Sequence, residues 1–367
     1  MIKVLVVAGT RPEIIKIAPL SILAKKEFSD SIDLKFCFAG QHKTMAEEAI
    51  EIFNLHCDFN LDIMKQNQSL NDIAKSVLEK LPEVLKQFKP DILLVQGDTT
   101  TAIISAMCAF NMKIPVGHIE AGLRSFNLDA PFPEEANRKI INTFSKLNFA
   151  PTNSAKNNLL NENINEKNIY LVGNTIIDAL EIISEKYNLD NLNSTIENIN
   201  KPFVLITAHR RESFGDGFKN ICEAILDCAI NHPTFEFVYP VHLNPNVREP
   251  VMNLLSNQKN IKLIEPVSYL KLLTLLKNCE FVLTDSGGIQ EEAPSFNKFC
   301  IVMRDVTERV ESIENGFAKL VGSDKEKIIA VVNERIKTDK TIDIKGNPYG
   351  DGKTSERILT IIENYFN

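Results

Sequence analysis

The first thirteen residues, Met1–Glu13, read MIKVLVVAGTRPE and join an apolar, β-branched run to a turn and to the start of a helix. Ile2–Val7 therefore predicts a first strand, and the apolar run is too short for a signal peptide. Pro12 suits the first turn of a helix, where its missing N–H is tolerated, and Glu13 suits the positive helix end. The stretch predicts a βα unit at the start of the chain.

A turn between a strand and a helix can present backbone N–H groups to an anion. Arg11 and Lys16 could add positive charge there, although surface basic residues beside an ordinary βα turn explain the same pattern. Pro19 lies further inside the predicted helix and is expected to kink or shorten it.

The rest of the chain repeats this alternation of short apolar runs with longer segments of helical period, such as Ser69–Phe88 and Gly217–Ile230. Such alternation is typical of βαβ units and parallel sheets covered by helices on both faces. The predicted strands are Ile2–Val7, Leu34–Ala39, Ile92–Gln96, Ile114–His118, Leu147–Ala150, Phe203–Thr207, Glu236–Tyr239, Ile261–Ile264, Phe281–Thr284, Phe299–Met303 and Ala318–Val321.

The strand series restarts near residue 200, after the polar, Asn-rich stretch Asp190–Pro202, which we interpret as a linker. With 367 residues the chain is long enough for two domains. We expect a Rossmann-like domain over 1–170, a second over 171–350, and a short helix over 351–367 that packs back on the first. Ligands bind beyond the carboxyl ends of such strands, so two doubly wound domains would face each other across a cleft.

Composition excludes several functional classes. The formal net charge of −7 argues against a general nucleic-acid binder, which needs a basic surface. No window of about 18 apolar residues predicts a transmembrane helix. The seven cysteines are odd in number and form no C-x-x-C pair, which favours free thiols in a reducing compartment. A cytoplasmic enzyme is the expected class.

Carboxylates follow several of the predicted strands or begin predicted helices. Asp98 lies in GDTT, Glu120 in HIEAGLRS, and Glu134 and Glu135 in PFPEEANR. Single carboxylates are mostly solvated or cap helices. Several at the strand ends of one domain, with basic residues beside them, could supply the base and the acid that abstraction of a proton from carbon requires.

The second domain contains two further candidate motifs. Ser286, Gly287 and Gly288 follow a predicted strand, and the glycines let backbone approach a ligand closely. A plain N-capped helix explains the same motif. His209 follows the first strand of this domain and could contact a phosphate, whereas His118 is expected to be a structural residue. The six histidines form no H-x-x-x-H pattern, so no metal site is predicted.

Together these segments resemble the non-hydrolysing UDP-N-acetylglucosamine 2-epimerase family. The matching segments run in the family's order from Gly9 to Ile358, and eleven weak motifs in order are specific where one is not. They read GTRPEIIKIAPL, AGQHKTM, VQGDTTTA, HIEAGLRS, PFPEEANRKI, VGNTIIDAL, ITAHRRESFG, Glu265-Pro266 with Tyr269, TDSGGIQEEAP, VMRDVTER and NPYGDGKTSERI.

The resemblance implies a fold like that of GT-B glycosyltransferases, a homodimer, and no metal or redox cofactor. It also implies a mechanism in which UDP leaves C1 while the C2 proton is removed, giving a 2-acetamidoglucal to which UDP adds back. The residues it implies for catalysis are Asp98, Glu120, Glu134 and His209. Those it implies for substrate binding are Arg11, Lys16, Gln41, His42, Arg138, Leu272, Ser286, Gly287, Gly288, Glu292 and Arg309.

Some positions depart from the family's usual pattern. Val310-Glu311-Ser312 replaces Pro-Glu-Ala, Asn67 stands where regulated members often carry Arg, and Leu272 replaces a Phe near the uracil. Asn67 in place of that Arg counts against regulation by another UDP-sugar molecule. Relatives of similar sequence act on UDP-N-acetylglucosamine, on diacetamido sugars or uronic acids, and on 6-deoxy amino sugars, and the sequence does not choose among them.

Three alternative functions remain open at this stage. A hydrolysing 2-epimerase would release N-acetylmannosamine, but its first motif resembles GTRAE, which makes Pro12 evidence against it. A glycosyltransferase of the same fold has less use for Asp98, Glu120 and Glu134. A silent sugar-nucleotide sensor would bind UDP and show no exchange at C2.

Overall fold

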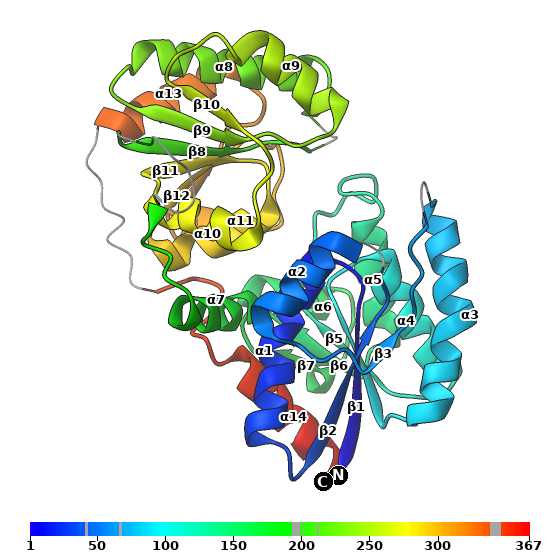
Figure 1. The fold of residues 1–367 in the computed structure, drawn as a ribbon. Coiled ribbons are helices and arrows are strands. Elements are labelled where there is room, and N and C mark those ends of the chain that lie inside the picture. Colours follow the sequence, from blue (N-terminus) through cyan, green and yellow to red (C-terminus); the bar gives the residue numbers. More distant parts are fainter. Residues whose placement is uncertain (41–42, 66–67, 193–198, 200, 211–212, 338–345) are drawn as a thin grey trace. The chain divides into compact units, whose positions relative to one another are not determined.

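The computed structural model describes the chain except for residues 41–42, 66–67, 193–198, 200, 211–212 and 338–345 (Figure 1). The described residues divide into two compact units. The first comprises Met1–Glu185 with Tyr349–Asn367, and the second comprises Lys186–Pro348. Compared with the boundary expected at 170/171, this division gives most of α7 (Thr175–Lys186) to the first unit. The expected linker Asp190–Pro202 falls largely outside the described residues.

The first unit is built on a seven-stranded parallel sheet in the order β3-β2-β1-β4-β5-β6-β7. Val4 to Ala8 of β1 are fully buried, as expected for a central strand covered on both faces. Two strands were missed in the sequence, because β3 and β7 have only two and three residues and so show no period. The strands are β1 (Ile2–Ala8), β2 (Ile32–Phe38), β3 (Phe59–Asn60), β4 (Ile92–Gln96), β5 (Val116–Ile119), β6 (Leu147–Ala150) and β7 (Ile169–Leu171).

Helices cover both faces of this sheet (Figure 1). On one face α3, α4 and α5 pack one against the next, and elsewhere α1 packs on α2 and on the C-terminal helix α14. The helices are α1 (Arg11–Glu27), α2 (Lys43–Phe53), α3 (Leu70–Phe88), α4 (Thr100–Asn111), α5 (Glu134–Phe144), α6 (Asn153–Asn161), α7 and α14 (Thr354–Phe366), with a short 3-10 turn, η1 (Glu166–Asn168).

Helix α1 corrects one expectation from the sequence. It continues through Pro19 to Glu27, so the proline does not shorten it. Pro19 is buried on a helix that packs against β1, β2 and β4 as well as two helices. This packing offsets the backbone hydrogen bond that a proline inside a helix removes.

The second unit is built on a six-stranded parallel sheet in the order β10-β9-β8-β11-β12-β13. Its strands are β8 (Phe203–Thr207), β9 (Glu236–Pro240), β10 (Ile261–Ile264), β11 (Phe281–Thr284), β12 (Phe299–Val302) and β13 (Ala318–Leu320). Its helices are α8 (Asp216–Asn231), α9 (Pro245–Leu255), α10 (Tyr269–Asn278), α11 (Gly287–Glu292), α12 (Val310–Glu314) and α13 (Lys325–Lys337), with the 3-10 turn η4 (Ala293–Phe296).

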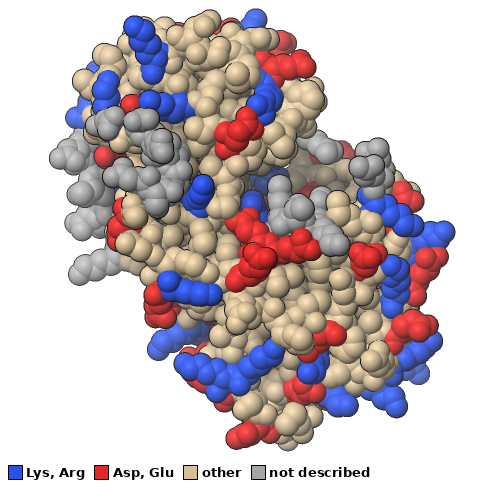
Figure 2. All heavy atoms as spheres, in the orientation of Figure 1, with Lys and Arg blue, Asp and Glu red and all other residues tan. Residues whose placement is uncertain are grey.

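The second unit has a buried hydrophobic core of its own. In the second unit α8 packs between α9 and α13, over buried side chains such as Phe218 and Tyr239. Among the described residues on the face drawn in Figure 2, basic and acidic side chains are interspersed and form no broad basic area. No helix in the described part of the chain is long and apolar enough to cross a membrane.

The seven cysteines are all free, and six of them are buried. Burial raises the pKa of the Cys108 thiol to about 11 and that of Cys222 to about 12. Thiols with such pKa values stay protonated and unreactive near neutral pH, so they act as small apolar side chains.

Candidate active site

The turn between β1 and α1 is closed by a carboxylate from its own helix. Oε2 of the buried Glu13 accepts hydrogen bonds from the backbone N–H groups of Gly9 at 3.0 Å and Thr10 at 2.7 Å. Glu13 therefore occupies the Gly9 and Thr10 N–H groups of the turn that the sequence predicted as an anion site. Arg11 remains at the rim of the turn, 3.7 Å from Glu48 of α2.

Lys16, one turn further along α1, pairs with Glu120 in a buried ion pair. Oε2 of Glu120 also accepts a hydrogen bond from Nε2 of Gln96, the last residue of β4, at 2.6 Å. Glu120 follows β5 directly and has φ +68°, a left-handed conformation that costs a residue with a side chain about 1–2 kcal/mol. The surrounding structure therefore determines where this carboxylate lies, as is common at functional sites.

Asp98 follows β4, the strand next to β5, and is held from α5. Nε of Arg138 donates to Oδ2 of Asp98 at 2.7 Å, and Nδ2 of Asn137 donates to the Asp98 carbonyl at 2.8 Å. The Arg138 side chain is only 4% exposed, while that of Asp98 is 22% exposed. Asp98 is thus the more accessible partner of this ion pair.

Helix α5 brings two more carboxylates to this place. Glu134 begins the helix and lies one turn before Arg138, so the two side chains share a helix face. Glu135 is fully buried and accepts hydrogen bonds from the N–H groups of Ser125 and Phe126 at 2.9 and 3.2 Å and from Arg138 at 3.3 Å. Cis peptide bonds precede Pro131 and Pro133 in the loop before the helix. The first unit therefore gathers Asp98, Glu120 and Glu134 with Lys16 and Arg138 at the carboxyl edge of its sheet.

His118 is confirmed as a structural residue. It is fully buried, with Nδ1 2.6 Å from Oδ1 of Asn142 and Nε2 2.7 Å from the Gly97 carbonyl. Desolvation lowers its pKa to about 4, so the ring is neutral at physiological pH. A neutral ring donates through one nitrogen only, and among the described residues Nδ2 of Asn142 has no hydrogen-bond partner. Turning the Asn142 amide lets Nδ2 donate to Nδ1 of His118 while Nε2–H donates to the Gly97 carbonyl.

In the second unit, His209 follows β8 and lies beside the end of β11. The backbone N–H groups of His209 and Arg210 donate to Oδ2 of the fully buried Asp285 at 2.6 and 2.7 Å. The His209 side chain is 41% exposed, lies 3.8 Å from Oδ1 of Asp285, and stacks on the His242 ring at 5.4 Å. An exposed imidazole with a fixed backbone is suited to meet a ligand.

The segment after β11 contains the predicted nucleotide contacts. Ser286, at the start of α11, is half-buried, and Ser286 N–H donates to Oγ1 of Thr284 at 2.9 Å. Gly287 is buried and Gly288 half-buried. A Cβ on Gly287 would lie 3.1 Å from Cζ of Arg309, so a side chain at this position would press against that guanidinium.

Two further predicted residues lie on neighbouring elements of the second unit. The Tyr269 hydroxyl at the start of α10 donates to Oε1 of the buried Glu292 at 2.7 Å, which fixes this carboxylate. Leu272, on the first turn of the same helix, is half-buried.

Arg309 lies in a buried network of ion pairs. Its Nε donates to Oε1 of Glu291 at 2.9 Å, and its NH1 lies 3.3 Å from Oε2 of Glu308, which also binds Arg304. Such a network fixes the orientation of the guanidinium at the cost of desolvating several charges. The remaining predicted contacts, Gln41 and His42, lie outside the described residues.

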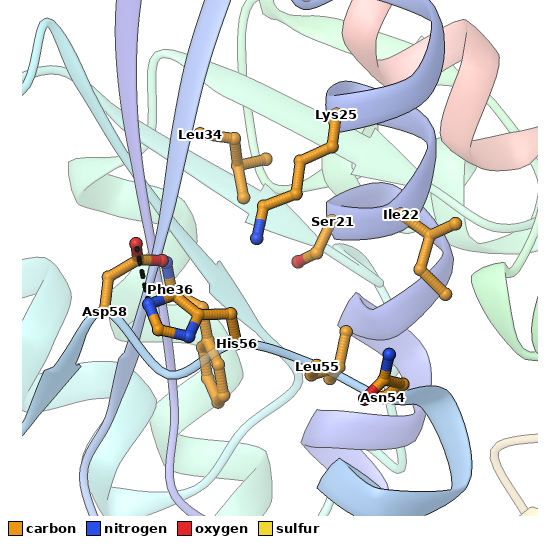
Figure 3. Close-up of a pocket in the computed structure, with 9 residues that line it drawn as sticks. All are labelled: Ser21, Ile22, Lys25, Leu34, Phe36, Asn54, Leu55, His56 and Asp58. Carbon is orange, nitrogen blue, oxygen red and sulfur yellow. Dashed lines mark hydrogen bonds and ion pairs between the residues drawn. The ribbon is translucent and has the colours of Figure 1, made fainter.

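A small hollow elsewhere in the first unit holds none of the predicted site residues. It lies between α1, β2 and the segment after α2 (Figure 3). Its free space is about 40 Å³, enough for about one water molecule. It is lined by Ser21, Ile22, Lys25, Leu34, Phe36, Asn54, Leu55, His56 and Asp58. Among the residues that the structure describes, no group of three or more His, Cys, Asp or Glu is arranged to hold a metal ion.

Comparison with known proteins identifies the family. The family model described as UDP-N-acetylglucosamine 2-epimerase matches residues 25–363. The UDP-N-acetylglucosamine 2-epimerase of Neisseria meningitidis serogroup A is 46% identical, over 99% of this chain and 100% of the relative. The chain belongs to the UDP-N-acetylglucosamine 2-epimerase family. The Escherichia coli K12 member is 45% identical, over 99% of this chain and 98% of its own length.

Solved structures of 2-epimerases agree with this assignment. The crystal structure of the N. meningitidis 2-epimerase bound to UDP-GlcNAc is similar with a TM-score of 0.92 at 45% identity, covering 99% of this chain and 100% of that one. The Methanocaldococcus jannaschii 2-epimerase in complex with UDP-GlcNAc and UDP has a TM-score of 0.86 at 38% identity, with coverage of 99% and 100%. The expected GT-B-like α/β fold with two Rossmann-like domains is thereby confirmed.

Three residues help to hold the candidate 2-epimerase site in ways that the sequence did not predict: Gln96, Glu135 and Asp285. All three stood within the quoted motifs, and Glu135 was named among the candidate carboxylates, but none was predicted to fix its neighbours. A polar residue closing an apolar strand was the available signal for Gln96 and, one position later, for Asp285. For Glu135 no local signal existed, because two adjacent carboxylates at a helix start point in different directions only once the loop before them is placed.

Proposed function

We propose that this chain catalyses the reversible C2 epimerisation of UDP-N-acetylglucosamine to UDP-N-acetylmannosamine. The observation that carries the proposal is the placement of Asp98 and Glu120 just beyond the carboxyl ends of the adjacent strands β4 and β5, each bonded to a buried cation. Family membership and the substrates named for the relatives support the same reaction. We also propose, from the family resemblance and the free cysteines, that the enzyme acts in the cytoplasm as a homodimer.

In the proposed reaction a carboxylate removes the C2 proton while the bond from C1 to the diphosphate oxygen breaks. The C–H electron pair becomes the C1–C2 double bond of a 2-acetamidoglucal, and UDP leaves with the electron pair of the broken bond. A carboxylic acid then protonates C2 on the opposite face, and a UDP oxygen bonds to C1. Substrate and product are isomers, so the cycle consumes no oxidant or reductant.

We assign proton transfer to Asp98 and Glu134. Asp98 keeps one oxygen bonded to Arg138, which leaves the other for a proton. The Glu120 side chain is less exposed than that of Asp98, and it is bonded to both Lys16 and Gln96. Its role is therefore to fix the charge of Lys16 near the substrate. A buried cation held in this way stabilises negative charge that develops during elimination.

The departing UDP is assigned to the second unit. His209 has the exposed imidazole for the diphosphate, with Arg309 of the same unit as a further cationic contact. Ser286, Gly287 and Gly288 would approach the phosphates through backbone, and Glu292 would bind the ribose hydroxyls as carboxylates do in other nucleotide sites. Leu272 would pack against the base, and Gln41 and His42 would complete the sugar contacts.

Proton NMR of the full-length protein with UDP-N-acetylglucosamine in D2O tests this proposal. The expected result is UDP-N-acetylmannosamine with deuterium at C2 in both epimers. Retention of the C2 proton with this substrate overturns the substrate assignment, and release of free N-acetylmannosamine with UDP overturns the non-hydrolysing assignment. Retention of the C2 proton with diacetamido, uronic and 6-deoxy UDP-sugars as well overturns the epimerase function.

A further inference from the structure

We propose that Glu13 is a positioning residue that holds Asp98 and the β1–α1 turn in one fixed arrangement. This inference rests on the proposed epimerase function, because it concerns the residue assigned to proton transfer. It adds a residue that never contacts the substrate and acts through the backbone at the ends of two neighbouring strands.

Glu13 connects two turns with its two carboxylate oxygens. Oε2 accepts hydrogen bonds from Gly9 N–H, Thr10 N–H and the Thr10 hydroxyl at 3.0, 2.7 and 2.8 Å. Oε1 accepts a hydrogen bond from the hydroxyl of Thr99 at 2.7 Å, 86 residues away in the chain. One side chain thus bonds the turn after β1 to the turn after β4.

The strands behind these two turns are neighbours in the sheet, with Val7 of β1 in register with Val95 of β4. Thr99 immediately follows Asp98 and also caps α4, since its Oγ1 accepts a hydrogen bond from Ala102 N–H at 3.1 Å. The hydroxyl therefore acts as acceptor toward its own helix and as donor toward Glu13. Its position fixes the backbone that directly follows Asp98.

Asp98 is consequently held from two sides. Helix α5 supplies Arg138 to its carboxylate and Asn137 to its carbonyl, while α1 supplies Glu13 through Thr99. Loss of the α1 side leaves the α5 side intact, so the aspartate would stay near its place with a less defined orientation. A displacement of about 1 Å at reacting groups can cost about a hundredfold in rate.

Burial determines which substitutions are informative. Glu13 is only 2% exposed, and burial raises the pKa of its carboxyl, against hydrogen bonds that lower it. The amide of Glu13→Gln can still accept from Gly9 and Thr10 through Oε1 and donate to Thr99 through Nε2. Glu13→Ala can do neither and leaves buried N–H groups without an acceptor.

The test compares five variants of the full-length protein by kcat, KM for UDP-N-acetylglucosamine and Tm. Glu13→Ala is expected to lower kcat by about thirtyfold to a hundredfold, whereas Glu13→Gln keeps it within about threefold. Thr99→Val is expected to lower kcat by about tenfold with KM changed less than about threefold, and Thr99→Ser restores it. Thr152→Val is the matched control, because Thr152 caps α6 of the same unit in the same way, accepting from Ala155 N–H at 3.2 Å.

Thr99→Val and Thr152→Val should lower Tm by similar amounts, with only Thr99→Val losing kcat. Equal loss of kcat in both, or unchanged kcat in Thr99→Val, overturns the positioning role even if Glu13→Ala fails to fold. If the wild-type enzyme exchanges the C2 proton in the same assay, such outcomes overturn only the positioning role of Glu13 and leave the proposed epimerase function standing. An inactive wild-type enzyme overturns both proposals together.

Discussion

The turn after β1 and the turn after β8 are each held by a buried carboxylate, but the two carboxylates come from different distances along the chain. In each, one buried carboxylate oxygen accepts hydrogen bonds from two successive backbone N–H groups. Glu13 does so for Gly9 and Thr10 in the first unit, from three or four residues away. Asp285 does so for His209 and Arg210 in the second unit, from 75 or 76 residues away.

The difference teaches how each turn becomes ordered. The Glu13 contact forms whenever the first turn of α1 forms, because a residue three positions after the cap reaches back to it. The Asp285 contact requires β8 and β11 to pair first, which closes a long loop at a cost in chain entropy. The first turn also borders Asp98 through Thr99, while the second contains His209 itself. We therefore expect changes beside Asp98 to act on kcat and changes beside His209 to act on substrate binding.

The largest expected effect comes from Asp98→Asn in the first unit. Loss of the base should lower kcat by about a thousandfold, within the range of general acid–base catalysis, with KM for UDP-N-acetylglucosamine changed only a few-fold. Steady-state kinetics and deuterium exchange at C2 measure this. Asp30→Asn, an exposed carboxylate between α1 and β2, is the control and should keep wild-type rates. A variant Asp98→Asn that retains a tenth of wild-type kcat would contradict the assignment.

Acid should destabilise the protein through His118. Its folded pKa of about 4 lies below the unfolded value of 6.5, so the folded state binds fewer protons and its stability is lost as pH falls from about 6.5 to 4. For this one group the loss amounts to about 3 kcal/mol between pH 7.5 and 4.

Buried acids whose pKa values are raised, including Glu13, have the opposite effect, because they make the folded state more stable as pH falls. The informative quantity is therefore the difference between wild type and His118→Gln in urea unfolding across this pH range. Parallel pH profiles for the two proteins would show that His118 does not carry the effect.

Asp285→Ala should release the turn that contains His209. Two backbone N–H groups lose their acceptor, which should lower the free energy of unfolding by about 2 kcal/mol and raise KM about tenfold, with less effect on kcat. Asp285→Asn keeps an acceptor oxygen and should restore most of both. Urea unfolding and steady-state kinetics measure the two quantities. A selective loss of kcat in Asp285→Ala would mean that the two turns do not divide the work as inferred.

The smallest effect should come from a contact that is neither buried nor near a site. Lys325 at the start of α13 pairs with Asp227 at 2.9 Å and Glu223 at 3.4 Å on the surface of the second unit. Lys325→Ala should lower Tm by less than about 2 °C, and high salt should remove the difference. Thermal unfolding at low and high salt tests this, and a decrease above about 5 °C would mean that surface pairs matter as much as the buried contacts.

Local signals were sufficient for most of the secondary structure. All eleven predicted strands are present, with ends shifted by two residues at most, because apolar runs and their flanking turns lie within a few residues. Resemblance over the whole chain added the family and the candidate residues. The two missed strands are so short that only their sheet neighbours define them.

The sequence by itself determined the alternation of strands and helices, the βα unit at the start of the chain, and the family, because each depends on neighbouring residues or on their order. Only the tertiary structure decided that Lys16 meets Glu120, that Arg138 meets Asp98, and that Asp285 holds the turn at His209. Those contacts join residues that strand pairing and helix packing bring together from distant parts of the chain. The same packing keeps α1 helical through Pro19, against the local preference of that residue.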